Sequence, residues 1–521
     1  MTKWLIYFVV CLSLLNTLHS QNKGLVQQQY DIIDGDEYLI IKNYVTALEI
    51  YKEIYKSIPD NRELQYKMAL CYLNTNTNRL EAIKYLEYVV KEEKFAPDAW
   101  FELGYAYALA YKLDEAITSL EKYKTLVPKQ SAKANIRIQQ CKNAKELMKQ
   151  PVNVSFSNLG KELNSAYPDY YPWITKDENF LAFTSRRKGN IGGSIEGDGY
   201  YSSDIYTSMA VNGKWSKAKN IGPAVNTALD EQVVGLKADG SEMLVYLDHY
   251  DDYGNLYSSK KKGNLFQKIS PLAEQINKKI EHSGSINLEG NTIFFIRKDK
   301  DKETESTDIF MCRKLPSGEW AEPQKLNSNV NTPFNEDFPY LAIDGKTLYF
   351  SSEGHNSMGG YDLYKTEWDP ETNNWSKAVN LGYPINTTDD DRSISLSPDN
   401  RVGYISAIRP GGYGDLDIYR IKFNDSQQQL IIYKGNISYT DSVKIPTECI
   451  ATITAIEKTT NEEYSFAPNP KTGSFVLALP AGTYAIIVNS SGYKDINETI
   501  IISDIGTSTT ERKKEFKLVK P

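Results

Sequence analysis

The stretch Leu348-Tyr349-Phe350-Ser351-Ser352, followed by Asp362-Leu363-Tyr364, decides the fold of this 521-residue chain. Asp344-Gly345 precedes it, and Asp-Gly between alternating apolar runs is a strong hairpin signal. The three segments therefore predict a turn and two neighbouring strands.

The end of this unit recurs along the chain at spacings of 51, 53, 54 and 55 residues. The five copies are Asp204-Ile205-Tyr206, Asn255-Leu256-Tyr257, Asp308-Ile309-Phe310, Asp362-Leu363-Tyr364 and Asp417-Ile418-Tyr419. A strand pattern precedes each copy, at residues 181–185, 244–246, 293–295, 348–352 and 403–406. Four short strands in each of about five units predict a β-propeller over residues 151–425. We expect five blades, with six as the alternative.

A fourth strand follows most copies and begins near a tryptophan: Trp215, Trp320 and Trp375. These copies then end in Asn226-Thr227, Asn331-Thr332 and Asn386-Thr387. The fifth copy has no such strand, but Val154–Gly160 before the first copy matches it. We therefore expect this N-terminal strand to complete the last blade, which leaves the ring without an open edge. The pattern resembles the WD40-like propeller repeat of the TolB type, which is found in bacterial envelope proteins.

Residues 25–150 carry a helical repeat. Trp100-x2-Leu103-Gly104-x2-Tyr107, then Ala116, Leu120 and Pro128, resembles the tetratricopeptide repeat. Ala47, Ala82 and Ala116 keep a spacing of 35 and 34 residues, so we expect about three repeats and a terminal helix over residues 131–149. The resemblance implies a groove for a partner peptide or helix. Its candidate residues are Tyr66, Leu70, Leu73, Phe101, Tyr105 and Leu109. Packing against neighbouring segments of the chain, for example Leu25–Tyr38, is the alternative interpretation.

Residues 430–521 are again rich in strand patterns. Ala451–Ile456 alternates cleanly, and Leu479-Pro480-Ala481-Gly482-Thr483-Tyr484 holds a turn before the next strand. Together these segments resemble the carboxypeptidase regulatory-like domain, a transthyretin-like β-sandwich. The whole chain is thus predicted to combine an N-terminal α-solenoid, a central propeller and a C-terminal sandwich.

The first 20 residues predict a secretory signal peptide. Lys3 precedes an apolar run from Trp4 to Leu15, which is too short to span a bilayer comfortably, and Ser20 fits a cleavage site. No later stretch predicts a transmembrane segment. We expect the mature protein to be periplasmic, with peripheral attachment to the outer membrane as a further possibility.

Composition excludes several functions. The chain has 60 Lys and Arg against 67 Asp and Glu, a net charge of −7, so we expect no nucleic-acid partner. Cys71, Cys141, Cys312 and Cys449 are far apart, which favours four separate buried thiols over a disulfide framework. With only four histidines, we expect no zinc site and no other cofactor.

Glycine-rich loops and acidic clusters invite a ligand-binding interpretation. The loops Gly189–Gly199, Gly354–Gly360 and Gly411–Gly414 precede predicted strands, whereas a phosphate site needs a following helix. The clusters Asp248–Asp252 and Asp389–Asp391 match no calcium-binding loop. We therefore expect ordinary loop geometry for the first set and solvated loops for the second.

The order of these parts resembles envelope proteins of Bacteroidetes, notably the PorE-like components of the type IX secretion system. Those proteins continue into an OmpA-like domain, whereas this sequence stops at Pro521 after the predicted sandwich, so we expect no peptidoglycan-binding domain. The resemblance implies a non-enzymatic scaffold for protein partners at the outer membrane, associated with secretion or gliding components. The alternative is a propeller that binds a glycan or metal in a nutrient system. We expect no catalysis, because no Gly-x-Ser-x-Gly segment is present and histidine is scarce.

Overall fold

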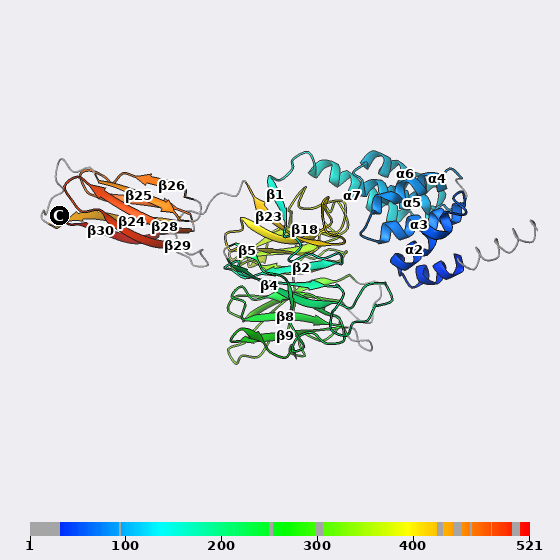
Figure 1. The fold of residues 1–521 in the computed structure, drawn as a ribbon, viewed down its shortest axis with the longest axis horizontal. Helices are drawn as coiled ribbons and strands as arrows, with labels where there is room; N and C mark the ends of the chain where they lie inside the picture. Colours follow the sequence, from blue (N-terminus) through cyan, green and yellow to red (C-terminus); the bar gives the residue numbers. More distant parts are fainter. Residues whose placement is uncertain are drawn as a thin grey trace, which may run out of the picture. The chain divides into compact units, whose positions relative to one another are not determined.

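The computed structural model describes residues 32–92, 95–211, 213–248, 254–298, 306–424, 431–440, 451–458, 461–480, 482–502 and 511–521. The predicted signal peptide and Cys449 lie outside these ranges. The chain divides into two compact units, of which the second is built mainly from residues 422–521. Figure 1 shows the elements along the chain.

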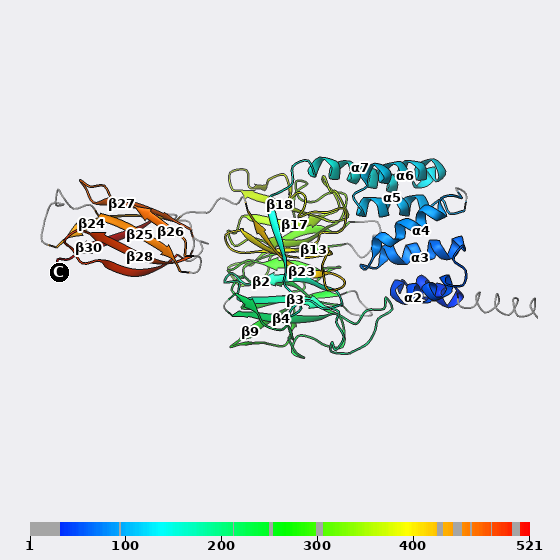
Figure 2. The same ribbon diagram turned by 45° about the horizontal axis from the view of Figure 1, so that its top comes forward.

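The N-terminal part is helical, and consecutive helices pack against each other. Figure 2 shows them stacked one after another. Gly104 allows two of them to cross closely, because a Cβ there would meet the Leu120 side chain at 2.6 Å. The helices are α2 (Tyr44–Tyr55), α3 (Arg62–Asn74), α4 (Ala82–Val89), α5 (Ala99–Leu109), α6 (Leu113–Leu126) and α7 (Ser131–Leu147), with 3-10 turns η1 (Arg79–Glu81) and η2 (Pro128–Gln130).

Five sheets follow the helices, and each has at least four strands. Blade 1 holds β2 (Asp169–Ile174), β3 (Phe180–Ser185), β4 (Asp204–Val211), β5 (Lys214–Trp215) and β6 (Lys219–Asn220). Blade 2 holds β7 (Glu231–Leu236), β8 (Glu242–Leu247), β9 (Asn255–Lys262), β10 (Leu265–Phe266) and β11 (Ser270–Pro271). Blade 3 holds β12 (Gly284–Ile286), β13 (Thr292–Arg297), β14 (Asp308–Arg313) and β15 (Gln324–Lys325). Blade 4 holds β16 (Glu336–Leu341), β17 (Thr347–Ser352), β18 (Asp362–Asp369), β19 (Asn374–Trp375) and β20 (Val379–Asn380). Blade 5 holds β21 (Ile394–Leu396), β22 (Val402–Ala407), β23 (Asp417–Phe423) and β1 (Val154–Asn158).

The five sheets form a closed propeller. The first strands of blades 1 to 4 contact one another in order. The lead-in to blade 5 bonds to blade 4 through Asp391 N and Tyr361 O, and Ser395 of blade 5 donates to the Pro172 carbonyl of blade 1. Blade 5 has the order β1-β23-β22-β21, which confirms that the N-terminal strand completes the last blade. The described residues thus hold five blades, as predicted.

The second unit contains two sheets around one hydrophobic core. One has the order β27-β24-β30, and the other has the order β26-β25-β28-β29. Buried residues alternate with exposed ones along β25 and β27, which is expected where one face of a sheet meets the core. The strands are β24 (Ile431–Tyr439), β25 (Ala451–Glu457), β26 (Glu463–Phe466), β27 (Ser474–Leu479), β28 (Gly482–Ser490), β29 (Ile496–Ile502) and β30 (Glu511–Leu518).

Candidate functional site

In three blades a buried aspartate holds the glycine-rich loop that precedes its own strand. Asp362 accepts hydrogen bonds from the backbone N–H groups of Met358 and Gly359, at 3.0 and 3.2 Å. Asp204 accepts from Ile191 N and Asp417 accepts from Tyr413 N, at 2.8 and 2.7 Å. The loops therefore wrap a carboxylate of the chain itself, so the aspartate that begins each Asp-Ile/Leu-Tyr motif is a loop anchor.

An asparagine of the outer strand completes each anchor. Asn220, Asn380 and Asn158 donate to Asp204, Asp362 and Asp417 respectively. Burial raises the pKa of Asp204 to about 6 and that of Asp362 to about 7, and it also raises the pKa of Asp417. In these three blades the loops are thus fixed by carboxyl groups whose pKa values are raised by burial.

A second asparagine bridges strands in every blade. Asn226, for example, accepts from Ile205 N and donates to Ile205 O, at 2.9 and 3.0 Å. Equivalent pairs are Asn277 with Leu256, Asn331 with Ile309, Asn386 with Leu363 and Asn164 with Ile418. This is the structural role of the Asn-Thr pairs in the sequence.

The turns between the helices meet these propeller loops. Three of these turns meet the propeller, and each of the three has one residue in the left-handed region: Lys42, Asn78 and Tyr111. At the first turn, a Cβ on Gly199 would lie 2.5 Å from Asn43 Oδ1, so the blade 1 loop passes very close to the helices. At the third turn, Tyr111 packs edge-on against Tyr383, with ring centroids 5.8 Å apart.

The second turn makes the strongest polar contacts with the propeller. Arg79 forms an ion pair with Asp389 and donates to the Tyr105 hydroxyl at 2.6 Å. Asn76 donates to Asp415 Oδ1 at 2.6 Å, and Tyr200 donates to the other oxygen of that carboxylate at 2.8 Å. One turn of the helical region is therefore tied to the segment that leads into blade 5 and to Asp415 of blade 5, which Tyr200 of blade 1 also contacts.

Helix α7 completes the contact on blade 4. Asn143 donates to the Ser357 carbonyl at 2.8 Å. Met358, which is 1% exposed, belongs to the same hydrophobic cluster as Ala134, Ile138 and Cys141 of this helix. The helices and the propeller therefore share both polar and apolar contacts.

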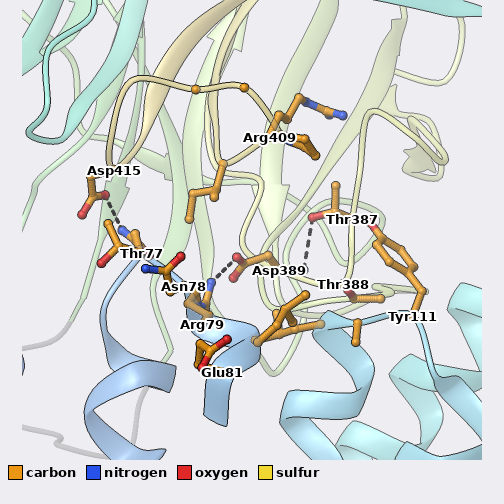
Figure 3. Close-up of a pocket in the computed structure, with 18 of the residues that line it drawn as sticks. Thr77, Asn78, Arg79, Glu81, Tyr111, Thr387, Thr388, Asp389, Arg409 and Asp415 are labelled. Carbon is orange, nitrogen blue, oxygen red and sulfur yellow. Dashed lines mark hydrogen bonds and ion pairs between the residues drawn. The ribbon is translucent and has the colours of Figure 1, made fainter. Parts of the chain in front are cut away.

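A cavity of about 870 Å³ opens where the second and third turns face the propeller loops (Figure 3). Residues 76–81 and 109–111 supply one wall. Tyr383, residues 387–389, residues 408–412 and residues 414–415 supply the other. Figure 3 shows Arg79 directed at Asp389 and Thr77 beside Asp415 across this space. Cavities of this size commonly bind small molecules or peptide segments.

The predicted groove residues lie in different environments. Leu109 lines the cavity, and Tyr105 reaches it through Arg79. Tyr66 and Leu70 are half-buried on α3, and Phe101 packs against Tyr123 with ring centroids 5.4 Å apart. The last of the six, Leu73, is 2% exposed and belongs to the helical core. Tyr105 and Leu109 are therefore the groove candidates nearest to the propeller.

Glu102, next to Phe101, also faces this region. Burial raises the pKa of its carboxyl to about 7, Lys133 and Arg137 act against that rise, and Asp98 adds to it. Arg137 in turn stacks over the Tyr105 ring, 4.6 Å from its centroid. The sequence pattern pointed to apolar groove residues and missed these charged ones.

The central channel is filled by side chains. Tyr171 of blade 1 and Phe338 of blade 4 have positive φ angles of 54° and 44°, and their rings meet with centroids 4.1 Å apart. Each precedes a proline within a bulged first strand. Non-adjacent blades thus touch across the axis through this pair of rings, which form an aromatic plug.

A polar cluster lies next to this plug. Asp337 contacts His282 Nε2 at 3.2 Å and Arg392 Nη1 at 3.7 Å. Burial alone would raise the pKa of Asp337, but His282 and Arg392 lower it below its ordinary value. The sequence carried a signal for the plug and the cluster. The segment Glu336–Tyr340 is an acidic pair followed by aromatic, proline and aromatic residues, and the segment Asp169–Trp173 ends in the same aromatic-proline-aromatic pattern.

The prediction of a solvated loop is wrong for Asp389–Asp391. Asp389 pairs with Arg79, and Asp390 pairs with Arg392. Asp391 is 4% exposed and accepts from both the backbone N–H and the hydroxyl of Thr387. The partner of Asp389 is distant in the sequence, so a local sequence pattern does not reveal this ion pair. For the other cluster, Asp251 and Asp252 lie outside the described residues.

The remaining sequence predictions concern thiols, metals and membranes. Cys71, Cys141 and Cys312 are buried and free, as predicted. Within the described ranges no group of three or more metal-ligating side chains is placed to hold an ion. In that same part of the chain, no helix combines the length and apolar character needed to cross a membrane.

No family model matches the chain, and no curated protein sequence matches it. Solved structures similar to it include TolB from Acinetobacter baumannii, with 16% identity, 51% of this chain and 57% of that chain covered, and a TM-score of 0.33. A putative TolB from Agrobacterium tumefaciens has 13% identity, covers 52% and 97%, and has a TM-score of 0.28. Sucrose-6-phosphate hydrolase from Lactobacillus gasseri has 10% identity, covers 71% and 95%, and has a TM-score of 0.33. This chain thus spans little more than half the length of the Acinetobacter protein. With such low identities and TM-scores, function has to be argued from the residues described above.

Proposed function

We propose that this protein is an exported, non-enzymatic scaffold that binds protein partners through its helical surface and the adjoining propeller loops. One observation carries the proposal: the turn between α3 and α4 is fixed to the propeller by Arg79–Asp389 and Asn76–Asp415, with an open cavity beside it. Two parts that hold each other in this way present a continuous, preorganised surface, which favours binding because little ordering is left to the partner.

The finer proposals rest on the sequence. The predicted signal peptide supports export to the periplasm. The order of tetratricopeptide-like helices, propeller and regulatory-like sandwich supports the domain boundaries 25–150, 151–425 and 430–521. It also supports association with secretion or gliding components at the outer membrane. The groove residues Tyr66, Leu70, Leu73, Phe101, Tyr105 and Leu109 are the proposed contact surface on the helices.

The test is mild crosslinking of the tagged full chain in its own cells, followed by purification and mass spectrometry. We expect envelope proteins to be enriched with the wild type and lost with Tyr66→Ala/Leu70→Ala. Leu265→Asp is the matched control, because Leu265 is 72% exposed on blade 2 and lies outside the proposed surface. Recovery of the protein alone, or equal capture by the wild type and both variants, would overturn the proposal. Circular dichroism of each variant establishes that it is folded.

A further inference from the structure

The cavity gathers exposed apolar side chains from both of its walls. Leu80 is 50% exposed and Tyr111 is 37% exposed on the helical side, while Ile408 is 39% exposed on the propeller side. Large apolar groups scattered singly over a surface need no explanation, but three around one cavity mark a contact site. An apolar side chain that entered between them would remove all three from water.

Most charges in the cavity walls are already neutralised by partners within the chain. Arg79 pairs with Asp389, and Glu81 pairs with Lys84. Asp415 accepts hydrogen bonds from Asn76, Tyr200 and its neighbouring backbone N–H. A charged ligand that displaced the partner of Arg79, Asp389 or Asp415 would leave an unpaired, partly buried charge. The Glu81–Lys84 pair is exposed, so its loss would cost little.

Arg409 is the remaining charged group of the walls. Its guanidinium lies 3.6 Å from the Phe156 ring centroid and donates to the Pro384 carbonyl at 2.8 Å. Its Nε atom is buried without a hydrogen-bond partner, and burial lowers its pKa. The Nε atom is therefore out of reach of an anion that enters from outside, and Nη2 already has the Pro384 carbonyl as its acceptor. Besides the exposed Glu81 and the partly exposed Asp389, which both have ion-pair partners within the chain, the accessible polar groups of the wall are uncharged ones: Thr77, Asn78 and the backbone of Gly411.

We propose that this cavity binds an exposed turn or chain end of a partner protein, which inserts one apolar side chain flanked by an uncharged main chain. The apolar side chain lies among Leu80, Tyr111 and Ile408, and the main-chain amides face the neutral polar groups. This inference rests on the proposed function and specifies the chemistry of the partner. The site is complete only while the helices and the propeller are docked, so partner binding and docking stabilise each other.

The experiment uses a phage-displayed library of random 12-residue peptides, selected on the full chain. We expect enriched peptides to share one large apolar position with uncharged residues on both sides. The best peptide is then labelled with fluorescein and titrated by fluorescence anisotropy. Leu80→Asp and Ile408→Asp should each weaken binding by about tenfold or more, which corresponds to about 1.4 kcal/mol. The control Leu265→Asp should bind like the wild type.

A second measurement tests the composite nature of the site. Arg79→Met removes the ion pair between the two walls and should weaken the same peptide, whereas Arg79→Lys, which keeps the charge, should restore part of the affinity. The peptide should raise the melting temperature of the wild type but not that of Leu80→Asp.

Three results would overturn the inference: enrichment of acidic or basic peptides, equal binding by Leu80→Asp and the wild type, or no peptide enriched at all. The proposed function fails separately. If crosslinked partners depend on Tyr66 and Leu70 but not on Leu80, the scaffold role stands and the cavity is not its contact site.

Discussion

Blades 1, 4 and 5 differ from blades 2 and 3 at one position of an otherwise shared repeat. In the first group an aspartate begins the third strand, accepts from its glycine-rich loop and pairs with an outer-strand asparagine. Blade 2 has Asn255 there instead, and blade 3 has Asp308, which takes Lys325 as its partner. The strand-bridging asparagine is common to all five blades. The repeat therefore contains two distinct interactions. The asparagine holds each blade together, whereas the aspartate anchor of blades 1, 4 and 5 shapes a loop.

The blades that have an aspartate anchor are also the blades whose loops contact the helices. Gly199, Ser357 and Asp415, which touch the helical region, lie in the glycine-rich loops of blades 1, 4 and 5. The blades that lack the anchor supply none of the hydrogen bonds to the helices that are seen among the described residues. We infer that the anchors fix loops for docking rather than for stabilising the sheets alone.

The largest expected effect comes from removing an anchor. Asp362→Ala should lower the free energy of unfolding of the propeller by about 3 kcal/mol, because several buried donors lose their acceptor. Urea denaturation followed by near-ultraviolet circular dichroism measures this change. Asp362→Asn, which keeps one acceptor oxygen, should recover part of the loss. A decrease below about 1 kcal/mol for Asp362→Ala would show that the loop is held by other contacts.

Breaking the docking contact should have a smaller effect. Arg79→Met should cost about 1–2 kcal/mol, since an ion pair and a hydrogen bond at a partly buried arginine are both lost. Limited proteolysis between the helices and β1 should become faster, with cleavage near residues 148–153. The control Lys56→Met removes an exposed ion pair with Glu53, away from the cleaved segment, and should change neither quantity. Unchanged proteolysis of Arg79→Met would argue against a docking role for this arginine.

The anchors also predict a pH dependence. Their pKa values are raised by burial, to about 6 for Asp204 and about 7 for Asp362, whereas unfolded aspartates titrate near 4. The folded state therefore holds more protons between about pH 4 and 7, so stability falls as pH rises through this window and levels off above it. Asp337, with its lowered pKa, acts in the opposite direction and only at lower pH.

Thermal melting at pH 5 and pH 8 measures this effect, and we expect a melting temperature a few degrees higher at pH 5. Asp362→Asn should flatten the profile. If the wild-type profile is flat, or if stability rises with pH across the window, the anchors are ionised in the folded protein and the assignment is wrong.

The smallest effect is expected in blade 2. Asn255→Ala should change the free energy of unfolding by less than about 1 kcal/mol, because this half-buried side chain holds no described loop. The same denaturation assay applies. A loss as large as that of Asp362→Ala would erase the distinction between the two groups of blades.

Much of the fold was predictable because its signals are local. The alternation in Leu348–Ser352 and the turn at Asp344-Gly345 fix a hairpin within a few residues of sequence. The missing outer strand of blade 5 was predictable as well, because a repeat with one absent part identifies its replacement. Likewise, Gly104 indicates directly where two helices cross, and Pro128 indicates where a helix ends.

The site was less predictable because its parts are distant in the sequence. Arg79 and Asp389 are 310 residues apart, so neither local pattern reveals the pair. The same reason explains why Asp389–Asp391 was predicted to be solvated. Tyr105 and Leu109 were predicted as groove residues from the resemblance to tetratricopeptide repeats, whereas the cavity that they adjoin depends on how two folds meet.

Closure of the last blade by β1 has a consequence for the order of folding. Asn158 in β1 and its partner Asp417 are 259 residues apart in sequence. Contacts of such long range carry a large loop-closure entropy and form late. Strand β1, the first strand of the propeller, therefore stays unpaired until the other strands of the last blade have formed. For a chain that is threaded across a membrane from its N-terminus, the ring closes only after nearly the whole sequence has emerged.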